Sequence, residues 1–337
     1  MEKKYGKKYD SFIKKTKSYF FDDNDKLLEN NRRIVELYLA QPIRNNCKMC
    51  GDRLDEECLS LISHGVKYIL CKKCNHLNGS HIETDDFCQK VYIEEDYGAA
   101  YYESTMEEFE KRTKTIYEPK MDFLVRNIKS PIKILDVGAG SGYFVNAGRK
   151  KGIDIKGIEV CENQVKFGNQ MLGENLIKKI DLKDTSNVIR ETNRNTVTMI
   201  GVLEHFKDFH EVLLSITKND NIKYFYFSVP LFSYSSIIEA VFPDVYNRQM
   251  SPDHTHLFTN ESLKYMCEKY NFDIIASWQF GMDAMDLIRA FCVHLGKENS
   301  AAVKMIKEKM VPLIDDIQYI LDKSEFSSEV HMLIQKC

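Results

Sequence analysis

Residues 132–143 constrain the fold of this chain more strongly than any other segment. They read Ile132-Lys-Ile-Leu-Asp136-Val-Gly138-Ala-Gly140-Ser-Gly142-Tyr143. A short apolar run that ends in a carboxylate and is followed by alternating glycines predicts a buried parallel strand, a tight loop and the start of a helix. Glycine allows positive φ angles and lets a ligand approach the bare backbone. We therefore expect a ligand to bind at this loop.

The spacing of the glycines excludes one common class of ligand. A loop that binds dinucleotides has the form G-x-G-x-x-G, in which the third glycine lets the helix pack on the strand. Counted from Gly138, the third glycine position is Tyr143. The loop is therefore not expected to bind a dinucleotide.

Strands and helices alternate along the chain from about Lys133 onward. The sequence predicts helices between six strands, near 132–137, 154–159, 176–181, 196–201, 223–229 and 272–279. This alternation is typical of an α/β fold with a Rossmann-like, doubly wound sheet. In residues 286–337 the apolar positions recur at helical spacing, which predicts a C-terminal helical extension that forms a cap or the face of a homodimer.

Two carboxylates follow the second and third predicted strands. Glu159 stands 23 positions after Asp136, at the carboxyl end of its strand. A carboxylate there can accept hydrogen bonds from both ribose hydroxyls of a nucleoside. Asp181 closes the third strand, where it could reach the amino group of an adenine. Both residues are candidates for cofactor binding, with a solvated surface carboxylate as the alternative.

The fourth predicted strand is followed by Gly201-Val202-Leu203-Glu204-His205. Ligands of open α/β sheets bind outside the carboxyl ends of the strands, so Glu204 and His205 are candidate catalytic residues. A histidine can remove a proton from a hydroxyl near neutral pH, and a neighbouring carboxylate can orient it. The alternative is that both side chains only cap the strand and line the ligand pocket.

A long connection follows the fifth predicted strand. Its first part, residues 230–250, is longer than packing requires, and such loops often cover a site. It contains side chains that could bind an aromatic or anionic group, namely Tyr234, Tyr246 and Arg248. It leads into Asp253-His254-Thr-His256-Leu-Phe258. We expect a substrate-binding loop in which His254 or His256 helps to bind or deprotonate the substrate.

Four cysteines in two C-x-x-C pairs predict a metal centre near the N-terminus. The pairs are Cys47 with Cys50 and Cys71 with Cys74, and Gly51 and Asn75 follow them at positions where a tight turn needs a left-handed residue. Four thiolates at this spacing form a closed tetrahedral Zn²⁺ site of the structural kind. Iron in an S4 site is the alternative, because geometry alone does not separate the two metals.

Length, charge and the distribution of apolar residues limit the binding partners and the cellular compartment that we expect. The 337 residues suffice for two domains, and the net charge of −3 speaks against a nucleic-acid partner. The lysine-rich first seventeen residues are expected to be solvated and poorly ordered. The chain has no signal-peptide pattern, and its most apolar stretch, Tyr224 to Phe232, is too short to span a bilayer. We expect a cytoplasmic protein without a membrane partner.

The glycine loop together with Asp136 resembles the first-strand loop of class I S-adenosylmethionine (SAM) methyltransferases. The resemblance extends over about Tyr97 to Phe280, and residues 253–263 resemble the DHxHxF…ESL segment of one branch of that class. It implies SAM as cofactor, with Asp136, Gly138, Gly140, Gly142, Glu159 and Asp181 as binding residues. An upstream tyrosine, among Tyr97, Tyr101 and Tyr102, would then cover the active site.

The cysteine pairs in front of such a domain narrow the resemblance further. The combination is similar to sugar C-methyltransferases that act on nucleotide-linked keto-deoxysugars and to related enzymes of surface-polysaccharide pathways. In those enzymes a tyrosine stands two residues before the Glu-His pair, whereas this chain has Val202. The departure favours methylation of a hydroxyl on a nucleotide-activated or phosphorylated sugar over C-methylation. Two further classes stay open: an RNA or protein methyltransferase whose zinc ribbon grips the target, and a non-enzymatic SAM-binding protein.

The predicted organisation therefore has four parts. Residues 1–46 form a helical or flexible segment, 47–90 a zinc-ribbon module, 91–285 the SAM-dependent domain and 286–337 the helical extension.

Overall fold

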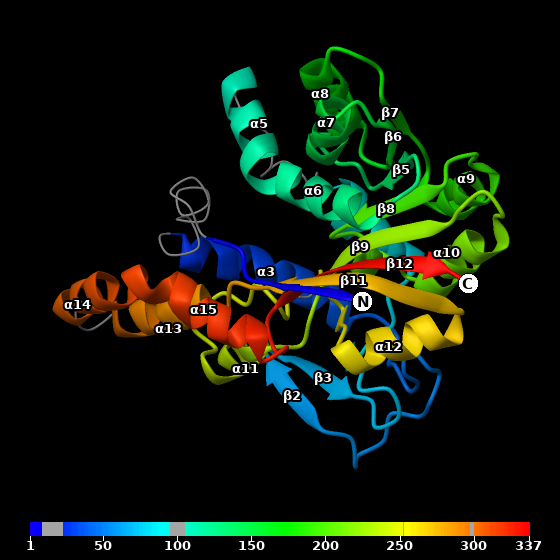
Figure 1. Ribbon diagram of the computed structural model, residues 1–337. Coiled ribbons are helices and arrows are strands. Elements are labelled where there is room, and N and C mark those ends of the chain that lie inside the picture. Colours follow the sequence, from blue (N-terminus) through cyan, green and yellow to red (C-terminus); the bar gives the residue numbers. More distant parts are fainter. Residues whose placement is uncertain (9–22, 95–104, 252, 297–299) are drawn as a thin grey trace.

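An eight-stranded mixed sheet forms the centre of the protein (Figure 1). The computed structural model describes residues 1–8, 23–94, 105–251, 253–296 and 300–337. The strand order is β1-β11-β12-β9-β8-β5-β6-β7. The strands are β1 (Glu2–Tyr5), β5 (Lys133–Val137), β6 (Asp154–Glu159), β7 (Ile177–Lys179), β8 (Thr196–Ile200), β9 (Tyr224–Pro230), β11 (Phe272–Phe280) and β12 (Glu329–Lys336).

Helices cover both faces of this sheet, as the alternation of elements predicts. The longer helices are α3 (Asn24–Leu39), α5 (Met106–Arg112), α6 (Glu118–Asn127), α7 (Tyr143–Lys150), α8 (Glu162–Leu172), α9 (Thr185–Glu191), α10 (Phe209–Lys218), α11 (Tyr234–Val241), α12 (Asn260–Lys269), α13 (Asp283–Gly296), α14 (Ser300–Met310) and α15 (Ile314–Lys323). Short helical segments are α4 (Asp85–Cys88), η1 (Gln89–Glu94), η3 (Thr113–Tyr117), η4 (Leu182–Asp184), η5 (Leu203–His205) and η6 (Val311–Leu313). None of the helices in the described ranges combines the length and the apolarity that a bilayer crossing requires.

Alternate side chains of the central strands enter two separate hydrophobic clusters. Phe225 and Phe227 of β9 belong to the cluster that contains α10 and α12, whereas Tyr226 belongs to the one that contains α6, α7 and α8. Successive side chains of a strand point to opposite faces, so both faces of the sheet are buried. The doubly wound α/β fold and all six predicted strands are confirmed.

The C-terminal extension is helical only in part. Helices α13, α14 and α15 agree with the prediction and extend to one side of the sheet (Figure 1). Residues 329–336 instead form β12, which pairs antiparallel with both β9 and β11. Its run Val330-His-Met-Leu-Ile334 is buried on both faces. A continuous apolar run of this length does not distinguish a helix from a central strand, so the prediction of helix was wrong here.

The lysine-rich N-terminus is ordered at its first residues. β1 pairs parallel with β11 at the edge of the sheet. The Lys4 ammonium lies 3.3 Å from the ring centroid of Trp278, and the Trp278 indole donates to the Gly6 carbonyl at 2.9 Å. Lys3 forms an ion pair with Glu325. These contacts explain why the expectation of a poorly ordered start fails for residues 2–5.

The cysteine-containing segment forms a second sheet, which also takes in a strand from the connection before α12. β2 (Ser60–Ser63), β3 (Val66–Leu70) and β4 (Leu77–Gly79) are antiparallel, and β10 (His256–Leu257) pairs with β4. In Figure 1, β2 and β3 lie below α12. Cys47, Cys71 and Cys74 are buried in the same cluster as α10 and α12. The module is therefore packed into the body of the protein rather than tethered beside it.

Candidate active site and cysteine centre

The glycine loop has the backbone conformation that its sequence predicts. Gly138, Gly140 and Gly142 have φ angles of 69°, 52° and 83°, in the left-handed region. A Cβ atom on Gly138 would lie 2.6 Å from Cγ2 of Val202. The loop after β5 therefore packs directly against the loop after β8, which places the glycine loop beside Glu204 and His205.

The carboxylate of Glu159 is held in place by backbone amides of the glycine loop and of the residues that follow β6. One of its oxygens accepts from the Gly140 amide at 2.9 Å, and the other accepts from the amides of Val160 and Cys161 at 2.7 and 2.9 Å. The side chain is buried. This carboxylate is thereby fixed at the carboxyl end of β6, the position from which it would accept the ribose hydroxyls of SAM.

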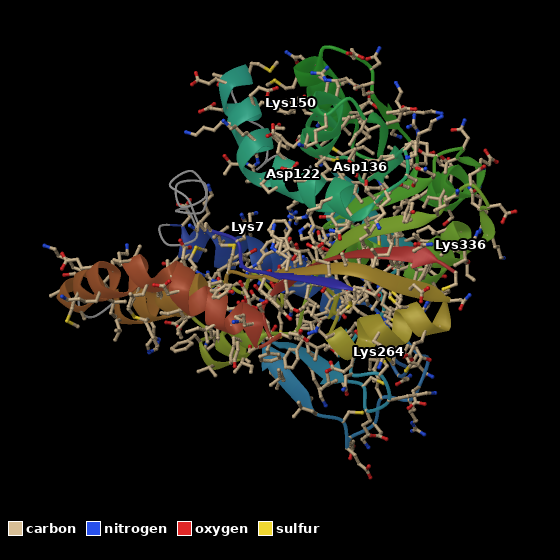
Figure 2. All side chains as sticks on the ribbon, in the orientation of Figure 1. Lys7, Asp122, Asp136, Lys150, Lys264 and Lys336 are labelled. Atoms are coloured by element: carbon tan, nitrogen blue, oxygen red, sulfur yellow. The ribbon has the colours of Figure 1, made fainter. Side chains whose placement is uncertain are left out.

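Asp136 is buried at the end of β5, in the half of the molecule that contains α7 and α8 (Figure 2). The Thr198 hydroxyl donates to it at 2.6 Å. Burial raises the pKa of Asp136 to about 7, and the charge of Glu159 contributes to the rise. A cationic ligand that neutralises this carboxylate would remove the cost of its burial, and SAM is a cation.

Asp181 is the third carboxylate predicted to bind the cofactor. It follows β7, is exposed, and forms an ion pair with Lys179 at 2.8 Å. Its role toward an adenine stays a prediction. The predicted covering tyrosines Tyr97, Tyr101 and Tyr102 lie outside the described residues.

Glu204, His205 and His254 meet where the loop after β8 faces the loop before β10. One ligand atom of each side chain lies within 4.8 Å of those of the other two. Nε2 of His205 is 4.0 Å from Oε1 of Glu204, and the rings of His205 and His254 have centroids 5.3 Å apart. Candidate catalytic residues about fifty positions apart in the chain are thus brought together, and their catalytic roles stay a prediction.

Burial sets the protonation of this group. It raises the pKa of Glu204 to about 8, and the nearby Glu329 and Asp253 carboxylates add to the rise. Burial also holds the pKa of His205 well below its usual range, and His254 lowers it further. At neutral pH the imidazole of His205 is therefore uncharged, which is the form that can accept a proton or bind a metal.

The other residues predicted to contact the substrate are placed differently. His256 is completely buried and shares a 2.9 Å hydrogen bond with His76 of the cysteine-containing module. Because its side chain is enclosed by the protein and paired with His76, its assignment as a substrate-binding residue was wrong. Arg248 forms a 2.7 Å ion pair with the buried Asp286. Its charge is therefore used within the protein instead of being open to an anion.

The two predicted tyrosines of the connection are separated from each other. Tyr234 lies exposed at the start of α11, with its ring 4.8 Å from that of Phe326. Tyr246 packs against the cluster formed by α13 and α15, and its carbonyl accepts from Arg289. The role of both tyrosines in substrate binding stays a prediction.

Lys120 and Glu329 form a polar pair near Glu204 that could not be recognised from the sequence. Glu329 begins β12, opposite Pro230 at the carboxyl end of β9, and its carboxylate lies 3.7 Å from the Lys120 ammonium. Nε2 of His331 donates to the Glu329 carboxylate at 2.9 Å, and Nδ1 of His331 shares a 2.9 Å hydrogen bond with the Tyr226 hydroxyl. The alternation of polar and apolar residues in 329–331 was the available signal, and it becomes readable only if β12 is recognised as a strand.

The cysteine-containing module holds the loop that carries His254. The Gly79 amide donates to the Thr255 carbonyl at 2.9 Å, and the Thr255 hydroxyl donates to the buried Glu83 carboxylate. The Tyr92 hydroxyl donates to the Asp253 carbonyl at 2.7 Å. Both neighbours of His254 are therefore anchored to residues 79–92, which fixes the position of the imidazole.

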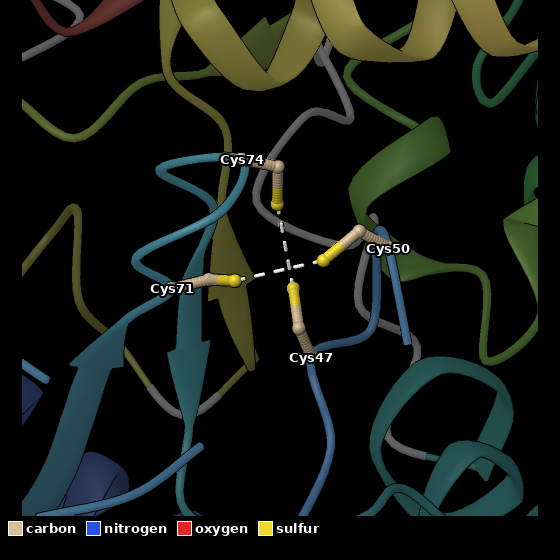
Figure 3. Close-up of side chains that lie close together, drawn as sticks. All are labelled: Cys47, Cys50, Cys71 and Cys74. Atoms are coloured by element: carbon tan, nitrogen blue, oxygen red, sulfur yellow. Dashed lines mark hydrogen bonds between the residues drawn. The ribbon is translucent and has the colours of Figure 1, made fainter. Parts of the chain in front are cut away.

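The four predicted cysteines converge on one centre (Figure 3). Their Sγ atoms lie within 4.8 Å of one another, with 3.6 Å between Cys47 and Cys74 and 3.6 Å between Cys50 and Cys71. A tetrahedral Zn²⁺ with Zn–S bonds of ~2.3 Å requires sulfur atoms about 3.8 Å apart. The side chains therefore fit a Zn²⁺ ion. Gly51 and Asn75 adopt the left-handed conformation predicted for the two turns.

Comparison with known proteins identifies the class. The family model described as a methyltransferase domain matches residues 109–277, which is half of the chain. The chain therefore belongs to this family and is a SAM-dependent methyltransferase of class I. No protein of curated function matches the sequence.

Two solved methyltransferase structures illustrate the similarity of the fold. A SAM-dependent methyltransferase from Archaeoglobus fulgidus is 19% identical, with 68% of this chain and 98% of that chain covered and a TM-score of 0.43. The plantazolicin methyltransferase BamL, solved with SAH, is 13% identical, with 74% and 94% covered and a TM-score of 0.46. Similarity at this level does not identify the methyl acceptor of this chain.

Proposed function

We propose that this enzyme transfers the methyl group of SAM to a hydroxyl of a nucleotide-activated or phosphorylated sugar, in the biosynthesis of a surface glycan in the cytoplasm. The observation that carries the proposal is the polar group Glu204, His205 and His254 beside the glycine loop. A hydroxyl is a weak nucleophile until its proton is removed or its charge is stabilised. Imidazoles and a carboxylate at the transfer point supply that function.

The second polar pair supports an acceptor rich in hydroxyl groups. Lys120 and Glu329 offer a donor and an acceptor of hydrogen bonds on the side of the sheet where Glu204 lies, since both act electrostatically on its carboxylate. Sugar hydroxyls both donate and accept hydrogen bonds, so a cleft with groups of both kinds suits them. The phosphate of such an acceptor would pair with Lys120.

The contact of Val202 with the glycine loop favours oxygen over carbon as the methylated atom. C-methylation next to a ketone needs an acid and a base that act on the carbon acceptor. Val202 packs on Gly138 and supplies neither. The C-methylation of a keto-deoxysugar is therefore the second candidate, supported by Glu204 and His205 alone.

In the proposed reaction the glycine loop and Glu159 bind SAM, and the acceptor lies between Glu204, Glu329 and the 230–258 connection. The acceptor oxygen attacks the methyl carbon as the carbon–sulfur bond breaks, and the residues at the end of β8 promote the loss of the hydroxyl proton. Holding both substrates in line contributes up to ~7–11 kcal/mol to lowering the barrier.

A panel experiment tests this proposal. The protein is incubated with SAM labelled in its methyl group and with nucleotide sugars and phosphorylated sugars, and products are identified by mass spectrometry. We expect label on an oxygen of one sugar, and a loss of turnover of about 10²–10⁴-fold in His205→Ala with SAM binding retained. Label on RNA or protein but on no sugar would contradict the proposal.

A further inference from the structure

We propose that Glu204, His205 and His254 bind a divalent transition-metal cation next to the SAM site. The three ligand atoms lie within 4.8 Å of one another, and Nε2 of His205 is 4.0 Å from Oε1 of Glu204. Metal–nitrogen and metal–oxygen bonds of ~2.0–2.2 Å place ligand atoms about 3–4 Å apart around one ion. A cation between the three side chains therefore needs only a small contraction of the group.

The hydrogen bonds of both imidazoles fix the same tautomer. Nδ1 of His205 lies 3.2 Å from the Asp253 carbonyl, and Nδ1 of His254 lies 3.0 Å from the Gln249 carbonyl. A carbonyl oxygen only accepts, so each Nδ1 carries the proton and each Nε2 carries the lone pair. Histidine ligands of metals almost always donate their other ring N–H to a carbonyl or a carboxylate in this way.

The third ligand is a carboxylate whose burial is otherwise costly. Glu204 is only 3% exposed, and its Oε2 has no hydrogen-bond partner among the described residues. A buried carboxylate without partners costs several kcal/mol unless a proton or a cation neutralises it. A bound cation would offset the cost of burying the Glu204 carboxylate.

The ligand set selects the class of metal. Two imidazoles with one carboxylate suit Mn²⁺, Fe²⁺, Co²⁺ and Zn²⁺, whereas Mg²⁺ and Ca²⁺ prefer oxygen ligands alone. Three protein ligands leave coordination positions open, in contrast to the closed centre of four cysteines. The two sites would therefore differ in both metal preference and role.

The inference rests on the proposed function and specifies how the acceptor hydroxyl is activated. Its oxygen would occupy an open position on the cation, which lowers the pKa of the hydroxyl so that its proton passes to water. The oxygen then forms the bond to the methyl carbon, the carbon–sulfur bond breaks, and S-adenosylhomocysteine leaves. The two histidines would act in this case as ligands that position the cation.

Metal titration tests the site without measuring activity. Protein with its cysteine centre filled with zinc is titrated with Mn²⁺, which thiolates bind poorly, and free Mn²⁺ is followed by electron paramagnetic resonance. We expect one Mn²⁺ per chain and at least a tenfold loss of affinity in both Glu204→Gln and His254→Asn. His294→Asn is the matched control, because His294 is an exposed histidine paired with Asp244, and it should bind like the wild type.

The titration has clear outcomes that would contradict the metal site. It is overturned if the wild type binds no Mn²⁺, or if Glu204→Gln and His254→Asn bind as well as the wild type. If these variants fail to retain their zinc, pulsed spectra of Mn²⁺ on the wild type replace them, and absence of ¹⁴N coupling from imidazole overturns the inference. SAM binding is measured in parallel by calorimetry. A protein that binds SAM but not Mn²⁺ contradicts the metal site only, whereas a protein that does not bind SAM contradicts the proposed function.

Discussion

Replacing Glu83 by glutamine should uncouple the cysteine-containing module from the active site. Glu83 is 3% exposed and forms ion pairs with Arg44 at 2.5 Å and Lys48 at 2.8 Å. It also accepts from Thr255, the residue after His254. The substitution keeps the size of the side chain but leaves two buried cations without a counter-charge.

The size of the effect follows from the pKa of Glu83. Burial alone would raise this pKa, but Lys48 and Arg44 together outweigh burial and lower the pKa from 4.5 to about 2. At ~1.36 kcal/mol per pH unit, this difference corresponds to about 3 kcal/mol of stability. It agrees with the ~3–5 kcal/mol that breaking a buried ion pair typically costs.

The pH dependence gives the sign of the effect. Because the folded-state pKa is below that of the unfolded chain, the stabilisation is fully present above pH 4.5 and is lost as the pH falls toward 2. The unfolding free energies of the wild type and Glu83→Gln should therefore differ by about 3 kcal/mol at pH 7 and converge in acid.

Urea denaturation at several pH values, with zinc present, measures this difference. Glu57→Gln serves as the control, since Glu57 is a surface carboxylate paired with Lys72, and it should behave like the wild type. The same stability for Glu83→Gln and the wild type at pH 7 would refute the reasoning, as would a difference that persists unchanged at pH 3.

Two further predictions concern the glycine loop and the cysteine centre. Gly138→Ala should weaken SAM binding and lower stability, because the added Cβ would lie 2.6 Å from Val202. Adding Val202→Ala should recover only part of the loss, because the ~1–2 kcal/mol cost of a positive φ remains. Full recovery of SAM binding in calorimetry would contradict the assigned strain. Cys74→Ser should abolish stoichiometric zinc in elemental analysis and lower the melting temperature, because the buried centre belongs to the main hydrophobic cluster. Replacement of the exposed Cys337 by serine should change neither quantity, and zinc retained by Cys74→Ser would show that the four cysteines do not form the site.

Local patterns were sufficient to predict the parts of the molecule whose partners are close in sequence. The glycine loop, the strand ends with Glu159 and Glu204, and the two C-x-x-C turns each depend on residues within one short segment. Their conformations agree with the predictions. His205 and His254 could each be named as candidates because each follows a strand of one sheet whose topology the alternation predicts, but their contact could not be predicted.

Long-range pairing explains what the sequence did not reveal. Arg248 is neutralised by Asp286, 38 positions away, and His256 is hydrogen-bonded to His76, 180 positions away. Neither pairing has a local signature, so a basic side chain and a histidine in a long connection both resembled substrate contacts. The role of Glu329 was hidden for the same reason, because it depends on where β12 enters the sheet.

The central claim is that SAM binds at the glycine loop with its methyl group directed toward Glu204 and His205. Calorimetric titration of SAM into the wild type, Glu204→Gln and Gly140→Arg tests it most directly. Gly140 has a φ of 52° and its Cβ would lie 2.9 Å from the side chain of Gln164, so arginine there should abolish binding. Glu204→Gln should bind SAM as the wild type does, because the proposed function places Glu204 beside the acceptor and not in the SAM site. Retention of SAM binding by Gly140→Arg in a folded protein would contradict the account.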